Sequence, residues 1–500
     1  MAEEIKEVPI ATTTGIIETD SENEKHGVIE VTDLSGGIDR EIEKRILRKF
    51  DLHIFPLLTF MYFCSSMDLS NLGNAKSDNF EADLHIKGNE YNILLSIWYV
   101  PVVFFGPPTN ILVKKYGAPL ILPILMMGFG SFLMFGAATK NWGGIMATRW
   151  FLGVFEAGFY PGVIFYMSLF YKRTELAGRL GAFFAAGSIA NGFTGLIAYG
   201  CFQIKGSLHG WQYLFLIEGT ITISSAILAF IVLPHSAARA KFLTPEEKEC
   251  AYQRMARDSS AVVDSKFVFK DAIKIWHEDK FFFCYMMVGV SNGVPLFSVS
   301  TFLVQIVQRL GYNTVQTNLL TVAPNVFGAI SLICFARSSD HFRNRAYHII
   351  GGLTLTMIGF IILAKIDVVS NKGVAYFACF LLCAGCSVPS PLLATWYNNN
   401  TPDEGKRAVT TALIEAVANL SGLISSNIFL PQDAPNYILA LGISAGFGGF
   451  AICLVTTMHL CMRYSNNKRD KLHGVKLRAQ DVNTAELTNG FKSEKFRYMY

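Results

Sequence analysis

The chain contains 500 residues, of which 51% are hydrophobic and 16% are charged, and its formal net charge is +4. Soluble proteins carry about 25% charged residues, so this composition excludes an ordinary soluble domain and indicates a protein with many membrane-spanning segments. The small net charge does not indicate nucleic-acid binding. The sequence contains no evident nucleophile–base set, phosphate-binding loop or metal-ligand cluster, so we expect neither an enzyme nor a bound cofactor.

The first half of the chain begins with a polar, acidic stretch, residues 1–39, which we expect to be a disordered cytoplasmic tail. The chain then turns basic. Ile38, Ile42, Ile46 and Phe50 recur every four residues, which predicts an amphipathic helix lying on the membrane surface. Windows of roughly 20 apolar residues, long enough to cross a bilayer as helices, follow. We place six spans in this half, at 53–73, 91–113, 119–138, 142–168, 179–201 and 212–234.

A polar central stretch, residues 236–280, separates this half from the next. Within it, Thr244 is a good helix N-cap, Pro245 suits the first helical position and Glu247 completes a capping box, so we predict a short cytoplasmic helix. Six further spans are expected at 281–306, 316–337, 347–366, 373–396, 408–429 and 437–461. The sequence thus predicts an all-α membrane protein with two six-helix bundles, residues 40–235 and 281–462, and a cytoplasmic tail, residues 463–500.

The distribution of lysine and arginine predicts the orientation of the chain. Alternate loops are basic, including the pair Lys114 and Lys115, and the central stretch and the flanks of both tails are basic as well. The opposite loops are weakly charged or acidic. Because positive loops stay in the cytoplasm, both termini and the central stretch are expected to be cytoplasmic.

Few ionisable residues lie inside the predicted spans, and such residues are functional candidates by default. The direction of each span places Asp68 and Arg149 in the outer third of the first and fourth spans, so the two side chains can pair if these helices are neighbours. Glu156 lies two helical turns deeper than Arg149 on nearly the same face, at roughly 1.5 Å per residue. It is near the midplane without an obvious permanent partner, and a carboxyl group that holds a proton there is what proton coupling requires.

These residues leave several interpretations open. Asp68 and Arg149 form either a fixed ion pair or a pair that breaks and reforms with protonation. Glu156 is our candidate proton carrier. Glu218 is as readily explained by a helix-packing hydrogen bond, and Glu415 either faces a central cavity or lies in helix contacts.

Several motifs, in order along the chain, resemble those of major facilitator superfamily transporters. They include MDLSNLGNAK (67–76), PTNILVKKYG (108–117), RWFLGVFEAGFYPG (149–162), WYNNNTPDEGKRA (396–408) and the C-terminal KFRYMY. More narrowly, the chain resembles the fungal allantoate permease group of anion:cation symporters, which includes the yeast high-affinity nicotinic acid permeases. The resemblance extends over roughly residues 40–462.

The resemblance implies two six-helix bundles around a central cavity, working by alternating access. It implies import of a small organic carboxylate or vitamin, such as nicotinate, allantoate or pantothenate, together with a proton and without another cofactor. Related symporters use the first-span aspartate and the fourth-span glutamate as proton sites, which here are Asp68 and Glu156. The resemblance also implies a plasma-membrane location, with the endoplasmic reticulum as the alternative, and we expect a monomer in the lipid bilayer.

One departure from the family pattern affects the expected substrate. The residue after the first-span aspartate is usually a cation, and here it is Leu69. An anionic substrate would then be held by Asn71, Asn191 or the positive end of a broken helix, or by Arg149 once Asp68 is protonated. Alternatively, the solute is neutral or cationic and carboxylates such as Glu415 bind it. A receptor that keeps the fold without transporting is a third hypothesis.

The basic loops resemble the gating motifs of the superfamily. Lys114, Lys115, Asp340 and Arg343 are therefore candidates for the cytoplasmic gate, with Asp340 capping or pairing across it. A solvated loop that only sets the topology accounts for the same charges.

Overall fold

The computed structural model describes residues 40–258, 275–401, 404–434 and 436–474, and residues 476, 477, 491, 493 and 495–500 near the C-terminus. The predicted tail at 1–39 and residues 259–274 of the central stretch lie outside the described residues. Throughout the described ranges, the regular structure is helical. Among the described residues, eleven helical segments are long and apolar enough to cross a membrane, and α18 (Glu404–Ile428) adds a shorter apolar segment, Leu413–Ile428. The predicted helical membrane protein is thereby confirmed.

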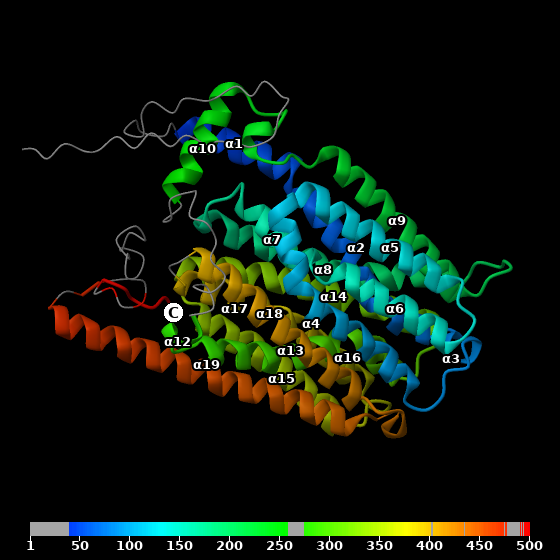
Figure 1. The fold of residues 1–500 in the computed structure, drawn as a ribbon. Coiled ribbons are helices and arrows are strands. Elements are labelled where there is room, and N and C mark those ends of the chain that lie inside the picture. Colours follow the sequence, from blue (N-terminus) through cyan, green and yellow to red (C-terminus); the bar gives the residue numbers. More distant parts are fainter. Residues whose placement is uncertain are drawn as a thin grey trace, which may run out of the picture. The chain divides into compact units, whose positions relative to one another are not determined.

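The first half packs its helices around a shared core (Figure 1). Helix α5 packs on α6 and α9, α4 packs on α6, and α2 packs on α8 and α9. The helices of this half are α1 (Arg40–His53), α2 (Phe55–Lys76), α3 (Phe80–Asp83), α4 (Glu90–Tyr116), α5 (Ala118–Ala137), α6 (Trp142–Glu156), α7 (Phe159–Ser168), α8 (Arg173–Cys201) and α9 (Gly210–Val232).

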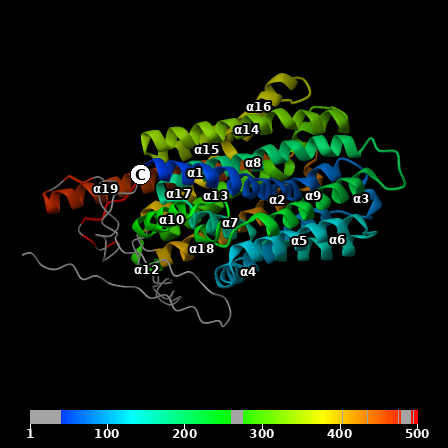
Figure 2. The ribbon, with the colours of Figure 1, turned by 90° about the horizontal axis from the view of Figure 1, so that it is seen from above.

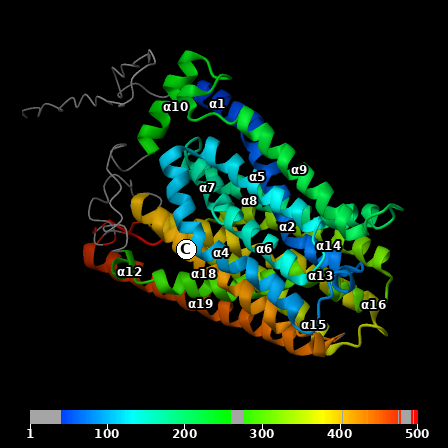
Figure 3. The same cartoon turned by 45° about the vertical axis from the view of Figure 1, so that its right-hand side comes forward.

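The second half repeats this kind of packing, with α13 against α18 and α19, and α15 against α16 and α19. Its remaining helices are α13 (Phe282–Gln308), α14 (Thr314–Phe342), α15 (Arg345–Lys365), α16 (Lys372–Cys386), α17 (Pro389–Asn400) and α19 (Ile438–His473). The two halves meet chiefly through α8 against α14 (Figure 2) and through α4 against α18 (Figure 3). The short elements are η1 (Ala237–Arg239), α10 (Pro245–Asp258), α12 (Ile275–Glu278) and η2 (Pro431–Asp433).

The fourth and tenth spans are each broken near the middle, whereas the sequence predicts continuous helices. Helix α6 ends at Glu156 and α7 begins at Phe159, and α16 and α17 are separated in the same way by Ser387 and Val388. Pro161 and Pro389 lie in the first turns of the second segments. Proline has no N–H to continue the preceding helix but fits the start of a new one, which explains why both spans restart there.

The short helix predicted in the central stretch is present as α10. Thr244 Oγ1 accepts a hydrogen bond from the Glu247 N–H at 3.3 Å, and Glu247 Oε2 accepts one from the Thr244 N–H at 2.8 Å. The reciprocal pair is the capping box that the residue types predict. Burial acts to raise the pKa of Glu247, but hydrogen bonds from Lys49 and Thr244 hold that pKa below its ordinary value.

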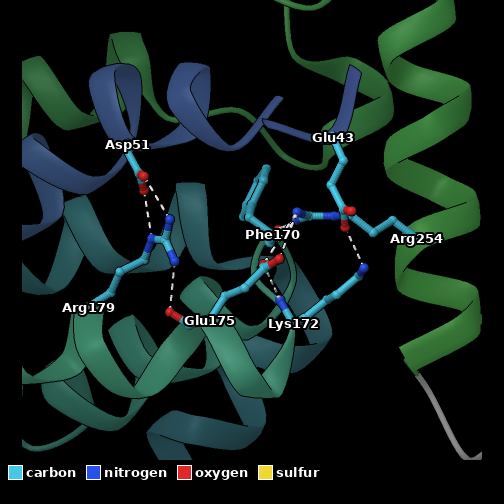
Figure 4. Close-up of polar contacts among 7 residues, drawn as sticks. All are labelled: Glu43, Asp51, Phe170, Lys172, Glu175, Arg179 and Arg254. Carbon is cyan, nitrogen blue, oxygen red and sulfur yellow. Dashed lines mark hydrogen bonds and ion pairs between the residues drawn. The ribbon is translucent and has the colours of Figure 1, made fainter. Parts of the chain in front are cut away.

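Helix α1 is amphipathic as predicted, but protein covers its apolar face, so our expectation of a helix on the membrane surface is wrong for that face. Phe50 is fully buried and contacts the rings of Phe170, Tyr171 and Phe242 edge-on. Ion pairs join the polar side of α1 to Lys172, just before α8, and to Arg179 within α8 (Figure 4). Periodicity reveals an apolar face, but not which surface covers it.

Figure 4 shows two of these ion pairs and a third from α10. Arg179 binds Asp51 through two hydrogen bonds of 2.6 and 2.7 Å, and Lys172 binds Glu43. Arg254 of α10 is fully buried, donates to the Phe170 carbonyl at 2.5 Å and pairs with Glu175 at 3.3 Å. Helices α1 and α10 therefore hold the C-terminal end of α7, the second segment of the broken fourth span.

Candidate functional site

Glu156 lies at the end of α6, where the fourth span breaks, and its carboxylate is contacted from two neighbouring helices. Ser65 of α2 donates to Oε1 at 2.5 Å, and Trp98 of α4 donates through its indole N–H to Oε2 at 2.8 Å. The side chain is half-buried, and among the described residues it has no ion-pair partner. Glu156 therefore has one neutral donor on each oxygen and no fixed cation, as the sequence predicts.

Close approach of α4 and α6 makes the contact with Trp98 possible. A methyl group at Gly153 would lie 2.7 Å from Pro101 Cγ and 2.8 Å from the Trp98 carbonyl oxygen, so only glycine fits there. Small residues allow helix backbones to pack this closely in membranes. The sequence contains this signal as RWFLGVFEAG, but it does not identify Trp98 or Ser65 as the partners.

Asp68 and Arg149 lie next to each other, as the depth argument predicts, but they do not form the predicted ion pair. Arg149 donates to the backbone carbonyl of Asp68 at 3.4 Å and to the side-chain oxygen of Asn71 at 2.9 Å. Asp68 is 1% exposed, and neither of its carboxylate oxygens has a hydrogen-bond partner in the part of the chain that the structure describes. The guanidinium of Arg149 therefore lies beside Asp68, but it binds the Asp68 backbone carbonyl and Asn71 and not the Asp68 carboxylate.

Asn71 links Arg149 to a second buried acid. Its amide nitrogen donates to Glu218 Oε2 at 3.0 Å, so the three side chains form a continuous hydrogen-bonded row inside the first half. Arg149 also lies over the ring of Phe215 at 5.2 Å. Asn71 and Glu218 are fully buried and Arg149 is 4% exposed. In this conformation, Arg149 and Asn71, two of the four side chains that the sequence nominates for substrate contact, are bonded to each other.

The second half contributes Glu415 from α18. Its Oε1 lies 3.4 Å from the hydroxyl of Tyr397, which lies about one turn before the C-terminal end of α17. Glu415 is half-buried, and α18, which carries it, packs against α4 of the first half. Asn191, on α8, is half-buried and is not joined to these groups by a hydrogen bond among the described residues.

The candidate gate residues lie at the ends of α4 and α14. Lys114 and Lys115 are exposed in the last turn of α4. Asp340 pairs with Arg345 of its own half at 2.5 Å, and a methyl group at Gly178 of α8 would lie 4.0 Å from its carboxylate. Arg343 ends α14 in a left-handed conformation, with φ of 51°.

Polar contacts between the halves join the ends of the helices that the predicted topology places outside. Asn318 donates to Ser77 at 3.1 Å, Asn92 donates to the carbonyl of Phe429 at 2.9 Å, and Asn427 donates to Ser96 at 2.8 Å. These residues lie at the end of α2, the starts of α4 and α14, and the end of α18. The two halves are therefore joined on this side.

An all-helical chain with this number of apolar spans is a multi-pass membrane protein. Residues 58–426 match the family model described as Major Facilitator Superfamily, so the chain belongs to this superfamily of secondary transporters, which is not a family of enzymes. Relatives with matching sequences agree with this. An uncharacterized transporter of Schizosaccharomyces pombe is 47% identical over 92% of this chain and 91% of its own.

Two further relatives have more specific names. The major facilitator-type transporter hxnP of Emericella nidulans is 41% identical over 92% of this chain and 94% of its own, and a high-affinity nicotinic acid transporter of Saccharomyces cerevisiae is 32% identical over 92% and 85%. Among solved structures, the xylose transporter XylE from E. coli, in a partially occluded inward-open conformation, aligns with a TM-score of 0.60. That alignment covers 82% of this chain and 98% of XylE at 15% sequence identity, which supports the fold alone.

Proposed function

We propose that this protein is a proton-coupled symporter that imports a small organic carboxylate or vitamin, nicotinate-like, by alternating access. The observation that carries the proposal is the balance of charge inside the first half. Three carboxyl groups, those of Asp68, Glu156 and Glu218, share one guanidinium, which is bonded to Asn71. An ionised carboxylate at mid-membrane costs roughly 2.5–3.5 kcal/mol, so carboxyls without a cation are stable there when they carry protons.

Asp68 is the first proton site of the proposal. Its side chain is buried without a hydrogen bond in the described structure, while Arg149 is held at its backbone carbonyl. Loss of the proton creates a charge beside the guanidinium, and Arg149 then leaves Asn71 for the Asp68 carboxylate. Protonation reverses this step, so the Arg149–Asn71 bond is the proton-loaded arrangement.

Glu156 is the second proton site, because it lies at the break between α6 and α7. Its two neutral donors come from α2 and α4, so a change in its charge acts directly on the packing of three helices. The contacts that join the outer ends of the halves correspond to a state closed to the outside. Lys114, Lys115, Asp340 and Arg343 are the residues of the opposite, cytoplasmic gate.

The name of the relative in Saccharomyces cerevisiae supports a nicotinate-like substrate. The sequence motifs support membership of the fungal allantoate permease group. Arg149, Asn71, Asn191 and Glu415 are the proposed substrate contacts, and a carboxylate replaces Asn71 as the partner of Arg149 while Asp68 is protonated. The proposed location is the plasma membrane. A neutral or cationic vitamin is the second candidate, because Leu69 replaces the usual cation and Arg149 is already bonded to Asn71.

Uptake of labelled nicotinate, pantothenate, allantoate and a cationic vitamin into transporter-deficient cells, with and without a protonophore, tests the proposal. We expect accumulation of a carboxylate that the protonophore abolishes. Glu156→Gln is expected to lower accumulation at least tenfold. Glu81→Gln, which changes a partly exposed carboxylate paired with Lys76, is the matched control. Protonophore-insensitive uptake removes symport, and unchanged accumulation by Glu156→Gln removes this proton site.

A further inference from the structure

The C-terminal segment, defined here as the described residues 491, 493 and 495–500, is seated on the second half. The side chains of Phe491, Phe496 and Tyr498 are 7%, 3% and 4% exposed. Tyr498 contacts the ring of Phe281, which precedes α13, edge-on at 5.2 Å, and Tyr500 contacts the ring of His459 on α19 at 5.1 Å. The segment therefore contributes to the hydrophobic core of this half.

Two asparagine side chains bind the backbone of consecutive residues in the segment. Asn466 of α19 accepts from the Tyr498 N–H and donates to the Tyr498 carbonyl, both at 2.9 Å. Asn400, the last residue of α17, accepts from the Met499 N–H at 2.8 Å and donates to the Met499 carbonyl at 3.0 Å. Neighbouring residues of an extended chain point in opposite directions, so the segment runs between α19 and α17 and joins them.

Charged and aromatic groups strengthen the contact at both ends. Trp396 of α17 donates to the Met499 carbonyl at 2.9 Å, and the Arg345 N–H of α15 donates to the Tyr500 carbonyl at 2.8 Å. Arg497 is 3% exposed and bonds Asp470 at 2.8 Å. Breaking one side of a buried polar network leaves the other side unsatisfied, which makes such networks rigid.

The helix that the segment holds is the cytoplasmic segment of the broken tenth span. Helix α17 starts after the break at Ser387 and Val388. Its N-terminal end is therefore not continuous with α16, and α16 does not fix its direction. Its other end carries Asn400, and one turn before that lies Tyr397, whose hydroxyl is the partner of Glu415. Fixing Asn400 therefore fixes the position of the Tyr397–Glu415 pair.

We propose that the C-terminal segment is a clamp that holds α17 against α15 and α19, with Asn400 and Asn466 as positioning residues for Tyr397 and Glu415. Only the consequence of the clamp for uptake rests on the proposed function. The first half has a comparable arrangement, in which Arg254 holds the carbonyl of Phe170 at the end of α7. That contact provides an internal reference, because the C-terminal segment does not act on it.

Hydrogen–deuterium exchange of the purified full chain in lipid nanodiscs tests the clamp without any substrate. In Asn466→Ala we expect amides of α17 to exchange at least tenfold faster than in the wild type, with α7 unchanged. Asn467→Ala, which alters the exposed neighbouring asparagine, is the matched control and is expected to match the wild type. Faster exchange in the C-terminal segment with unchanged α17 overturns the proposal.

The second variant is a deletion of residues 491–500. It tests whether the C-terminal segment holds α17 even if Asn466→Ala does not fold. Accelerated exchange confined to α17 and its neighbours supports the clamp, and wild-type exchange in α17 overturns it. Uptake measured in the same variants separates the two proposals. If the exchange result holds and no solute is transported by the wild type, the clamp stands and the proposed function fails.

Discussion

Arg149 donates a hydrogen bond to the side-chain oxygen of Asn71 at 2.9 Å, whereas the carboxylate of Asp68, on the same helix as Asn71, accepts none within the described residues. The guanidinium is already at the Asp68 backbone carbonyl, at 3.4 Å. We expect Arg149 to exchange its neutral partner Asn71 for the Asp68 carboxylate when that carboxylate is ionised. This alternative pairing is the element that protonation of Asp68 controls in the proposed cycle.

Replacing Arg149 by lysine is expected to abolish this exchange of partners. A guanidinium presents several donors in a fixed plane, whereas an ammonium is a single compact charge that does not span both the Asp68 carbonyl and Asn71. We expect uptake to fall at least tenfold and the free energy of unfolding to fall by about 1–3 kcal/mol, because buried polar groups lose their partners. Uptake rates and thermal unfolding in detergent measure both effects. Arg48→Lys, on the exposed side of α1, is the control, and wild-type uptake by Arg149→Lys contradicts the exchange.

Glu218→Gln is expected to leave uptake within about twofold of the wild type. A glutamine oxygen still accepts the hydrogen bond that Asn71 donates to Oε2, and the substitution removes a buried acid whose Oε1 has no partner among the described residues. Removing an uncompensated ionisable group is neutral or stabilising when the shape is kept. Asp68→Asn, in contrast, is expected to lower accumulation at least tenfold. Equal losses in the two variants would show that Glu218 is also a proton site.

The sequence predicts those parts of the fold that depend on local chemistry. The capping box at Thr244 and Glu247 identifies α10, and span directions place Asp68 and Arg149 at one depth. Hydrogen-bond partners depend on how each helix is rotated about its axis, which one sequence does not specify. That is why Asn71 replaces Asp68 as the partner of Arg149, and why Trp98 and Ser65 are not predictable as partners of Glu156.

We also did not predict the breaks in the fourth and tenth spans from the sequence. Unlike the hydrogen-bond partners, these breaks have a local signal in the sequence. Pro161 and Pro389 stand in the first turns of α7 and α17, yet α4 continues through Pro101, Pro107 and Pro108. A proline is tolerated within a membrane helix where neighbouring groups satisfy the carbonyl that it frees, so a proline by itself does not specify a break. Apolar length alone therefore predicts the spans but not their interruptions.

Gly153→Ala is expected to uncouple Glu156 from Trp98. The added methyl group would lie 2.8 Å from the Trp98 carbonyl, so α4 must move away from α6, and overpacking of this kind costs about 1–3 kcal/mol. We expect lower thermal stability and lower accumulation. Gly143→Ala, in the same helix, meets ordinary contact distances only, so helix propensity makes it neutral or stabilising. The measurement is the change in unfolding temperature of each variant relative to the wild type, which we expect to be negative for Gly153→Ala and zero or positive for Gly143→Ala. An unchanged unfolding temperature for Gly153→Ala contradicts the close approach of α4 and α6.

Asp279, which precedes α13, is expected to make the stability of the second half dependent on pH. Burial raises its pKa from 3.8 to about 6, although the Phe281 N–H, which donates to Oδ1 at 2.9 Å, acts to lower it. The folded protein then binds the proton more tightly than the unfolded chain. The stabilisation is fully present below pH 3.8 and is lost as the pH rises through about 6. The pKa difference corresponds to a free energy on the order of 3 kcal/mol.

Asp279→Asn keeps an acceptor for the Phe281 N–H but does not titrate, so it is expected to remove this dependence. The unfolding temperature of the wild type, relative to Asp279→Asn, is expected to fall between about pH 4 and pH 7 and to stay level above that range. Asp367→Asn is a control of opposite sign. Hydrogen bonds from Ser370 and Val369 lower the pKa of exposed Asp367, so its contribution is present at neutral pH and is lost on acidification. A wild-type curve parallel to that of Asp279→Asn would mean that the Asp279 carboxyl is not buried in the folded protein.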